Sequence, residues 1–245
     1  MSRFVCDLHV HSCLSPCGDD DMTPYSIAGM AKLNGLDMVA LTDHNSCGNC
    51  ATFFEACAHY GIIPVPGMEL TTAEDIHLLC LFPTLDQALE FDQAVGAQRI
   101  RVKNRPQVFG NQLLIGLEDA VVGQEPDLLI NATALTIAQG TALARDFGGV
   151  AYPAHIDRES NGIIAVLGDF PQEPQFAAVE YNDSGNVARY TADYGLGDRR
   201  VVVSSDAHQL WNLSEGDFSL ELPCDKEPER ARQTLVDVLN GNMPM

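Results

Sequence analysis

Short apolar runs that end abruptly in polar residues alternate along the chain with segments of helical spacing. The apolar runs predict strands at residues 4–11, 38–42, 62–65, 76–82, 149–152, 177–181 and 201–204. Amphipathic spacing predicts helices at residues 23–35, 51–60, 85–97, 135–147 and 228–240. Residues 99–130 are less regular, with one hairpin expected from 111–115 and 120–124 across a turn at 117–119. The alternation indicates βαβ units, so we expect an α/β fold with a largely parallel sheet, arranged as a single irregular barrel-like domain over residues 1–245.

Five of the seven histidines lie where a predicted strand ends. They are His9, His11, His44, His155 and His208. Glu69 follows the apolar segment IIPVPGM in the same way, and Asp206 comes two residues before His208. Because catalytic groups in parallel α/β folds converge at the carboxyl ends of strands, we expect these side chains to meet. Two imidazoles on one strand face can chelate a metal, and the adjacent Asp7 is expected to orient one of them through its second nitrogen.

The two remaining histidines differ in position. His77 lies near the start of the segment IHLLCLF, so this strand is expected to run against its neighbours. His59 lies inside the predicted helix EACAHY, and we interpret it as a surface residue. A single histidine is more often structural than a ligand. Five histidines at strand ends, together with two carboxylates, favour a metal site instead.

Six motifs follow one another between residues 7 and 208: DLHVHS, ALTDHN, VPGMEL, the isolated His77, PAHID and SSDAH. In this order and spacing they resemble the polymerase and histidinol phosphatase (PHP) family of metal-dependent phosphoesterases. The resemblance spans most of the chain and implies a distorted (β/α)7 TIM-like barrel of the PHP type. It also implies a hydrolase that acts on phosphate esters and holds two or three divalent metal ions at the mouth of the barrel.

The resemblance assigns the ligand residues to three overlapping sites. The first site takes His9, His11, Glu69 and Asp206. Glu69 also bridges to the second site, which is completed by His77 and His155. The third site takes His44 and His208. Near the third site the chain departs from the family pattern and reads SPCGDDD, so Cys17 is the expected further ligand, with Asp19, Asp20 and Asp21 as alternatives.

A multinuclear site of this kind accounts for the hydrolysis of a phosphate ester. Metal ions neutralise the phosphoryl oxygens, lower the pKa of a bound water to about 7 and stabilise the leaving oxygen. We therefore expect in-line attack on phosphorus by a metal-bridging hydroxide at a di- or trinuclear centre. Imidazole and carboxylate ligands suit Zn, Mn or Fe and do not choose among them.

Cysteines near the predicted barrel mouth offer a different interpretation. Cys47 and Cys50 form a CxxC pair after His44, and Cys13 and Cys17 follow the HxH motif. Four thiols that met there would bind zinc or an iron–sulfur cluster. We favour loop thiols, because only one of the pairs has a common ligand spacing.

Substrate phosphate also needs cationic help beyond the metals. Arg158, three residues after His155, is the best placed candidate for a phosphate ligand. Lys103 and Arg105 form the main basic cluster, within the irregular and lid-like segment. An exposed surface charge is the commoner role of such residues, so we retain Arg158 alone.

Three polar residues beside the predicted strands are candidates for supporting roles. Glu180 and Asn182 end the segment AVEYN and are expected to line the pocket or to hydrogen-bond a metal ligand. Asp43 precedes His44 and is expected to support it or to cap the next turn.

Charge narrows the class of substrate. The chain has 34 acidic residues against 14 basic ones, for a formal net charge of −20. Such a charge repels polyanions, so we expect a small phosphorylated metabolite or nucleotide as substrate, and neither a long nucleic acid nor a membrane surface as partner. No signal peptide or long apolar span is recognised, and the expected location is the cytoplasm.

Three other functions stay open at this point. One is an exonuclease-like phosphodiesterase that acts on short oligonucleotides. Another is a metal-dependent amidohydrolase or deaminase, because HxH and Asp ligands recur at the mouths of such barrels, although the order DLHVH, TDHN, GMEL disfavours it. The last is a non-catalytic metal-binding module, which the altered segment SPCGDDD leaves open.

Overall fold

The computed structural model describes residues 1–243. The strands in this part of the chain are Ser2–Val10 (β1), Met38–Leu41 (β2), Ile63–Thr71 (β3), His77–Leu81 (β4), Leu113–Ile115 (β5), Val121–Gln124 (β6), Val150–Pro153 (β7), Ala178–Tyr181 (β8), Arg200–Val203 (β9) and Ser219–Leu222 (β10). The α-helices are Pro24–Leu33 (α1), Cys50–Tyr60 (α2), Leu85–Gly96 (α3), Pro106–Phe109 (α4), Ile137–Asp146 (α5), Ile163–Leu167 (α6), Val187–Tyr194 (α7) and Pro228–Leu239 (α8). Short 3-10 helices occupy Leu117–Asp119 (η1), Ser184–Asn186 (η2) and Leu210–Asn212 (η3).

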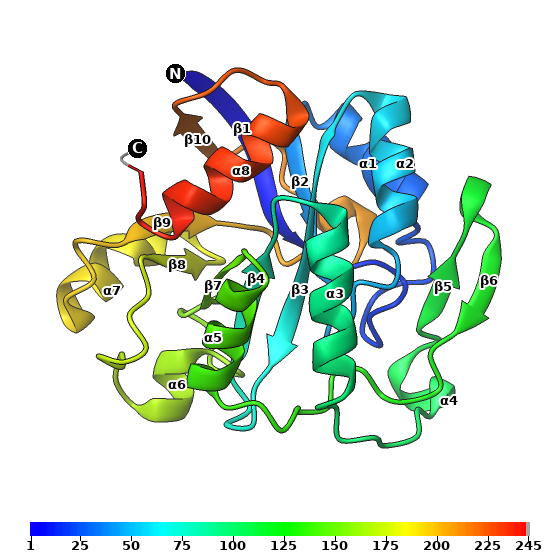
Figure 1. Ribbon diagram of the computed structural model, residues 1–245, viewed down its shortest axis with the longest axis horizontal. Helices are drawn as coiled ribbons and strands as arrows, with labels where there is room; N and C mark the ends of the chain where they lie inside the picture. The colour runs from blue at the N-terminus through cyan, green and yellow to red at the C-terminus, as the bar shows by residue number, and fades with distance from the viewer. Residues whose placement is uncertain (244–245) are drawn as a thin grey trace.

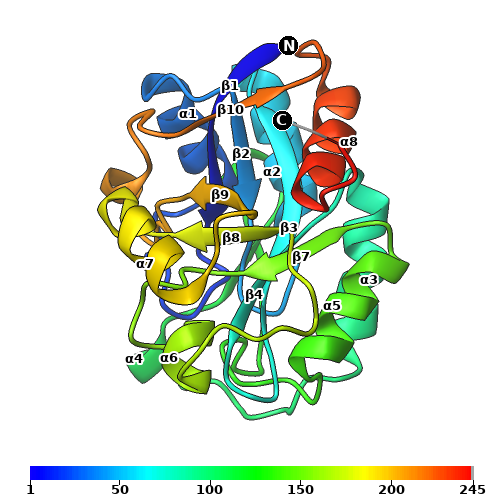
Figure 2. The same ribbon diagram turned by 90° about the vertical axis from the view of Figure 1, so that its left-hand side faces the viewer.

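The main sheet has six strands in the order β10-β1-β2-β3-β4-β7, and β8 and β9 form a separate parallel pair. β1, β2 and β3 are parallel, whereas β4 is antiparallel to both β3 and β7, as the position of His77 predicted. The pair β8-β9 lies between β7 and β1 (Figure 2). Ile156 N–H, just after β7, donates to the Glu180 carbonyl at 2.9 Å, and His11 N–H, just after β1, donates to the Ala207 carbonyl at 3.0 Å. The result is an α/β fold with a curled sheet.

Apolar side chains pack in two buried clusters, one on each face of the curled sheet. Phe4, Cys6 and Leu8 belong to a buried cluster that also contains residues of α8, which lies against β3, β7 and β10. Val10 instead belongs to a second cluster, between the sheet and the other helices. The alternation of β1 therefore reverses between Leu8 and Val10, and the register with β2 shifts in the same stretch, which is the mark of a β-bulge.

Helix boundaries follow the local chemistry of the sequence. Thr23, Thr84 and Thr136 precede α1, α3 and α5, and each side chain accepts a hydrogen bond from a backbone N–H of the first turn. Gly61 ends α2 in the left-handed conformation, with φ of 70°. The predicted helices are all present, with ends shifted by at most a few residues.

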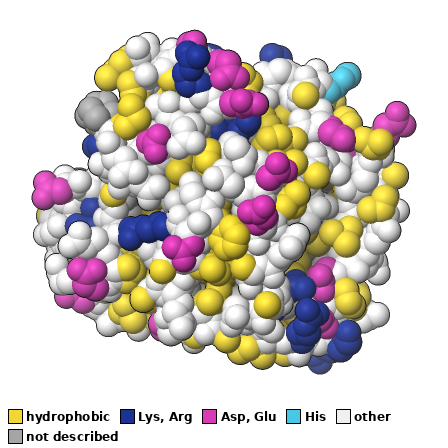
Figure 3. Space-filling view, viewed as in Figure 1, with side chains coloured by type: hydrophobic (Ala, Val, Ile, Leu, Met, Phe, Trp, Pro, Cys, Tyr) yellow, Lys and Arg dark blue, Asp and Glu magenta, His cyan; other side chains and the backbone are white. Residues whose placement is uncertain are grey.

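The irregular segment contains the predicted hairpin, formed by β5 and β6 with η1 at the turn. This hairpin stands apart from the sheet, next to α2 (Figure 1). Basic side chains gather on the same face near α4 (Figure 3), where Arg101, Lys103 and Arg105 are exposed. Asp127 pairs with both Arg101 and Lys103, at 2.9 and 3.0 Å.

Within residues 1–243, helices are too short or too polar to cross a membrane.

Candidate metal centre

The curled sheet brings the predicted ligands to one end of its strands. His9 lies in β1 and His11 just after it, while His44, His155 and Asp206 follow β2, β7 and β9. Glu69 lies in β3, and antiparallel β4 places its first residue, His77, opposite Thr71 at the end of β3. Seven of these eight predicted ligands are buried, and His208 is partly exposed. The convergence expected from the sequence is therefore present.

Glu69 stands at the centre of the cluster. Its Oε1 lies 2.7 Å from His77 Nδ1, 2.9 Å from His155 Nε2 and 3.4 Å from His9 Nε2. Its Oε2 lies 2.9 Å from His44 Nδ1 and 3.3 Å from His11 Nε2. One carboxylate thus faces five imidazoles, with its two oxygens directed to different sets.

The residues of the first predicted site form one compact group. The ligand atoms of His9, His11, Glu69 and Asp206 all lie within 4.8 Å of one another. His9 Nε2 and His11 Nε2 are 3.0 Å apart, and Asp206 Oδ1 lies 3.3 and 3.1 Å from them. Two imidazoles and two carboxylates at this spacing can share one ion.

The residues expected at the second site lie together around Glu69, with His44 beside them. His44, Glu69 and His77 form a group within 4.8 Å, so His44 faces this site as well as the third. His155 contacts Glu69 but does not join that group.

His11, which was expected at the first site, also lies beside the residues expected at the third. His11, His44 and His208 form a group within 4.8 Å. Cys17 is exposed as a residue, but its Sγ lies 3.3 Å from His44 Nε2. Cys17 and the alternatives Asp19, Asp20 and Asp21 all join none of the groups in the described chain, and Cys17 differs from the aspartates in its contact with His44. The geometry favours Cys17 among the candidates of the SPCGDDD segment.

Several buried polar atoms of the cluster have no hydrogen-bond partner. They are His44 Nδ1, Glu69 Oε2, His77 Nε2, His155 Nδ1 and Asp206 Oδ1. Buried polar groups are almost always paired, and those that are not need an explanation. His44 Nδ1 and Glu69 Oε2 are only 2.9 Å apart and still form no hydrogen bond. Electron-pair donors that converge in this way fit a cation between them.

Four histidines of the cluster have shifted pKa values, two raised and two lowered. Burial opposes protonation of His9, but the carboxylates of Glu180, Asp206 and Glu69 together raise its pKa well above the usual range. For His11 burial is likewise outweighed by Asp206 and Glu69, which raise the pKa to about 9. Burial lowers the pKa of His44 to about 3 and that of His208 to about 4. The imidazoles of His77, His9 and His44 outweigh burial and hold the pKa of Glu69 well below its usual value.

Glu180 orients His9, a role that the sequence analysis expected Asp7 to have. Glu180 Oε1 lies 2.8 Å from His9 Nδ1 and accepts from the His155 backbone N–H at 3.1 Å. Asp7 instead accepts from the Ser205 hydroxyl at 2.6 Å and the Ser214 N–H at 3.1 Å. The expectation for Asp7 was wrong because the bulge in β1 separates its side chain from those of the histidines. Asp7 acts on the site through the loop that carries Asp206.

Asp43 supports the centre through serines that sequence reasoning missed. It accepts hydrogen bonds from the Ser12 hydroxyl and the Ser15 hydroxyl, both at 2.6 Å. Ser15 Oγ also lies 2.8 Å from His11 Nδ1 and accepts from the His44 N–H at 3.2 Å. Serines in a loop carry no signal by themselves, so only the fold reveals this chain of contacts. Asn182 is not part of the support, since its amide donates to the Ser204 carbonyl at 3.1 Å.

Two of the predicted ligands have strained backbones. His155 has a φ of 28° and Asp206 a φ of 52°, values that residues other than glycine rarely adopt. Such strain persists only where the surroundings impose it, and it clusters at functional sites.

A cavity of about 330 Å³ opens onto the cluster. Besides the site residues, it is lined by Ile130, Arg158, Ser160 and Asn161. Arg158 Nη1 pairs with Asp206 Oδ2, and the Arg158 side chain is half exposed. The arginine singled out from the sequence therefore borders the site, whereas Lys103 and Arg105 do not line this cavity.

The cysteines do not gather into a second metal site. Cys47 and Cys50 are buried in the apolar cluster, and both thiols point to the Gly67 carbonyl. Cys13 is buried with its thiol 4.0 Å from the Leu113 carbonyl. Cys13, Cys47 and Cys50 join none of the metal-ligand groups found within residues 1–243, and they are buried thiols where loop thiols were expected.

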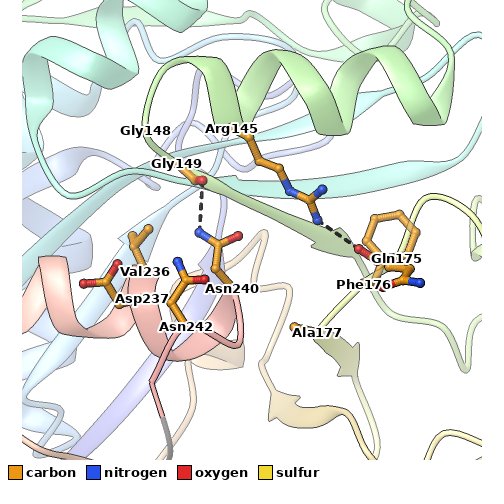
Figure 4. A pocket seen from close by; sticks show the side chains of 10 residues that line it. All are labelled: Arg145, Gly148, Gly149, Gln175, Phe176, Ala177, Val236, Asp237, Asn240 and Asn242. Carbon is orange, nitrogen blue, oxygen red and sulfur yellow. Dashed lines mark hydrogen bonds between the residues drawn. The ribbon is translucent and has the colours of Figure 1, made fainter.

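A larger cavity, of about 610 Å³, lies at the other end of the strands, where β7 and β8 begin. Figure 4 shows Asn240 donating to the Gly149 carbonyl, at 3.2 Å, and Arg145 donating to the Gln175 carbonyl, at 2.9 Å. Its charged lining residues are one arginine and one aspartate, Arg145 and Asp237. The cavity lacks a group of metal ligands among the described residues, so the candidate chemistry lies at the histidine cluster.

Comparison with solved structures shows the same fold in several hydrolases. The lesion-specific endonuclease PfuEndoQ from Pyrococcus furiosus is 18% identical, with a TM-score of 0.67 over 98% of this chain and 56% of that one. Endonuclease Q bound to a 27-mer duplex with an abasic lesion is 18% identical, with a TM-score of 0.64 over 98% and 57%. A putative metal-dependent phosphoesterase from Bifidobacterium adolescentis is 19% identical, with a TM-score of 0.54 over 83% and 87%. The chain thus spans just over half the length of endonuclease Q.

Sequence comparison supplies the family. No curated protein matches the chain significantly. The family model for the PHP domain matches residues 7–138, which is more than half of the chain and includes the DLHVHS, ALTDHN and VPGMEL motifs. The resemblance drawn from these motifs is confirmed: the chain belongs to the PHP domain family.

Proposed function

We propose that the protein is a metal-dependent phosphoesterase that hydrolyses small phosphate esters. The observation that carries this proposal is the position of Glu69, whose two carboxylate oxygens face five imidazoles in a buried cluster. A buried carboxylate shared in this way suits a bridging ligand between neighbouring cations. Membership of the PHP family supports the same activity.

The residues present fit a centre of two or three divalent ions. His9, His11, Glu69 and Asp206 would hold one ion, and Glu69, His77 and His155 a second. Ions bound there would supply water of lowered pKa and neutralise charge on the phosphoryl oxygens. Glu180 and Ser15 would keep the second nitrogens of His9 and His11 engaged, so that Nε2 of each ring faces the centre.

The third site would include a thiolate. Nitrogen and sulfur ligands that share a tetrahedral ion at about 2.1 and 2.3 Å lie roughly 3.5 Å apart. The separation of 3.3 Å between Cys17 Sγ and His44 Nε2 fits this arrangement. His208 would complete the site, since His11 Nε2 would be taken by the first ion. A thiolate favours Zn or Fe at this position over Mn.

Arg158 would bind the substrate phosphate. Among the residues that line the cavity of the cluster, it is the one with a permanently positive side chain. A planar guanidinium can donate two parallel hydrogen bonds to phosphate oxygens. Its present pairing with Asp206 keeps it at the edge of the cavity where the phosphate would lie.

Size and charge of the site favour a small substrate. The cavity of about 330 Å³ suits a compact ligand, and the net charge of −20 repels a polyanion. The fold shared with endonuclease Q bound to a DNA duplex makes cleavage of oligonucleotides a second candidate, because a phosphodiester is attacked by the same kind of centre. The net negative charge of the protein repels an oligonucleotide more strongly than a small phosphate monoester, so it favours the monoester as substrate.

We also infer that residues 1–245 form one PHP-type domain with a distorted (β/α)7 barrel. Two hydrogen bonds join the pair β8-β9 to β1 and β7, from His11 to Ala207 and from Ile156 to Glu180. They support a closed arrangement of the strands.

The test combines metal content with turnover in a single preparation. Protein purified without chelator, and protein reconstituted with Zn, Mn or Fe, is assayed with p-nitrophenyl phosphate, nucleoside monophosphates, sugar phosphates, a labelled single-stranded oligonucleotide, an abasic duplex and an amide panel. We expect metal-dependent release of phosphate from monoesters, and loss of both metal and turnover in Asp206→Asn. Turnover of amides alone, or stoichiometric metal without hydrolysis of any ester, would contradict the proposal.

A further inference from the structure

An apolar pocket adjoins the cavity of the metal centre. It measures about 270 Å³ and is lined by Pro16, Cys17, Val108, Phe109, Gly110 and Ile130. Cys17 and Ile130 also line the cavity over the histidine cluster, so the two spaces share a wall. Apart from the Cys17 thiol, the side chains that line this pocket are hydrocarbon.

The far wall of the pocket is built against the loop that follows β1. Gly110 has a φ of 90°, and a Cβ at this position would clash with the Pro16 carbonyl oxygen. Asn104 Nδ2 donates to the Gly110 carbonyl at 2.9 Å, and the Phe109 N–H donates to the Arg105 carbonyl at 3.0 Å. These contacts hold the backbone of α4 and Gly110 against the loop that carries Pro16 and Cys17.

Exposed apolar surface in this wall calls for an explanation. Val108 is 63% exposed, although it belongs to helix α4 and lines the pocket. The Arg105 guanidinium lies 5.6 Å from the centroid of the Phe109 ring, which leaves a cation and an aromatic ring together beside the pocket. An apolar patch next to polar chemistry is typical of a ligand-binding surface.

We propose that this pocket binds a planar, apolar organic group of the substrate while its phosphate occupies the metal centre. The inference rests on the proposed function and narrows the substrate to aryl-type or heteroaromatic phosphate esters. A cavity of about 150 Å³ can hold benzene, so the pocket has room for a ring. A sugar phosphate would place hydroxyl groups against carbon and leave them without partners. Shared lining by Cys17 and Ile130 makes the ring site continuous with the phosphate site.

The test compares two phosphonates that differ only in their organic group. Binding of phenylphosphonate and of methylphosphonate to the metal-loaded full chain is measured by isothermal titration calorimetry, which does not depend on turnover. We expect phenylphosphonate to bind at least tenfold more tightly. Val108→Asp, a change at an exposed position, should lower the affinity for phenylphosphonate about tenfold and leave the affinity for methylphosphonate unchanged. Phe109→Ala should also lower the affinity for phenylphosphonate.

A matched control is Val122→Asp, because Val122 is 69% exposed in the same segment but does not line the pocket. It should leave both affinities unchanged. Equal binding of the two phosphonates by the wild type, or equal losses for both ligands in Val108→Asp, would overturn this inference and leave the phosphoesterase proposal standing. Failure of both phosphonates to bind the metal-loaded wild type would overturn the two proposals together.

Discussion

His9 Nδ1 lies 2.8 Å from Glu180 Oε1, and this contact joins the end of β1 to β8 across the curled sheet. Both side chains are buried, and His9 presents its other nitrogen to His11 at 3.0 Å. A carboxylate on the second nitrogen of a ligating histidine fixes the orientation of the ring and raises its basicity. We therefore expect Glu180 to tune metal binding at the site, although it belongs to none of the ligand groups.

Glu180→Gln should weaken metal binding, because the amide keeps the shape of the side chain but removes its charge. Loss of such a partner typically lowers metal affinity by about 10- to 100-fold, and the titration of chelator-treated protein with Zn²⁺ measures it. The matched control, Glu221→Gln, changes an exposed residue of β10 and should bind like the wild type. Equal affinity in Glu180→Gln and the wild type would refute the orienting role.

Ser15→Ala should reduce both stability and metal affinity. The hydroxyl donates to the buried Asp43 carboxylate at 2.6 Å and contacts His11 Nδ1 at 2.8 Å. A buried group left with an unmade hydrogen bond costs about 1–3 kcal/mol, which denaturant unfolding with and without metal will detect. The exposed Ser184 provides the control variant Ser184→Ala. An unchanged unfolding midpoint in Ser15→Ala would show that the contact is not stabilising.

Cys17→Ser should abolish a thiolate signature of the third site. Burial of the thiol, with the charges of Glu69 and Asp206, raises the pKa of Cys17 to about 12, so at neutral pH the thiolate forms only when it binds a cation. Cobalt-substituted wild type should show thiolate-to-cobalt absorption in the near ultraviolet, and Cys17→Ser should lose it. Cys224→Ser, in which a partly exposed thiol outside the site is changed, should retain the band. Persistence of the band in Cys17→Ser would exclude Cys17 as a ligand.

Arg158→Met should impair turnover without removing metal. A hydrogen bond from a charged donor contributes about 1.5–3 kcal/mol, so kcat/KM for a phosphate monoester should fall about 10- to 100-fold. Metal content should match that of the wild type, because Arg158 is not a ligand. Arg189→Met, at an exposed position on α7, serves as the control. Full activity of Arg158→Met would remove this residue from the phosphate site.

Metal removal should lower thermal stability. A ligand that binds only the folded state adds about 2.7 kcal/mol per site at a free concentration of 100 times Kd. For a chain of this size that corresponds to a shift of roughly 5–10 °C in Tm. Calorimetry with metal and with chelator measures the shift, which Glu69→Gln should diminish. Identical melting in the two conditions would mean that the cluster binds no cation.

The ligand cluster could be predicted from the sequence because its members occupy equivalent places in the fold. His9, His44 and His155 lie at or just after the ends of parallel strands, and the topology brings these ends together. His77 fits the same rule in reverse, since β4 is antiparallel and begins where its neighbours end. Strand periodicity and direction were sufficient for these positions.

Supporting roles were expected for Glu180 and Asp43, but their partners could not be predicted because the contacts join residues far apart in the sequence. Strand alternation placed Asp7 beside His9, but the bulge before Val10 reverses the side-chain pattern, and Glu180 from another strand takes that position. The extent of β3 was also underestimated, because Pro64 and Pro66 lack the N–H of a ladder. The Pro66 carbonyl accepts a hydrogen bond from the Phe82 N–H, so the backbone of Pro66 faces β4, and Pro64, two residues earlier, faces the same side. Ladder pairing with β4 begins only at Gly67, and the pairing with β2 uses the other side of the strand. The missing N–H groups of the two prolines therefore cost no ladder hydrogen bond.

Anomalous X-ray diffraction from crystals of the metal-loaded protein tests the central claim most directly, because it locates each ion. The account predicts peaks inside the cluster around Glu69, one bounded by His9, His11 and Asp206 and another by His77 and His155. A further peak is expected beside Cys17 and His208. Absence of anomalous density within the cluster, or peaks confined to the protein surface, would contradict the assignment of these side chains as a metal centre.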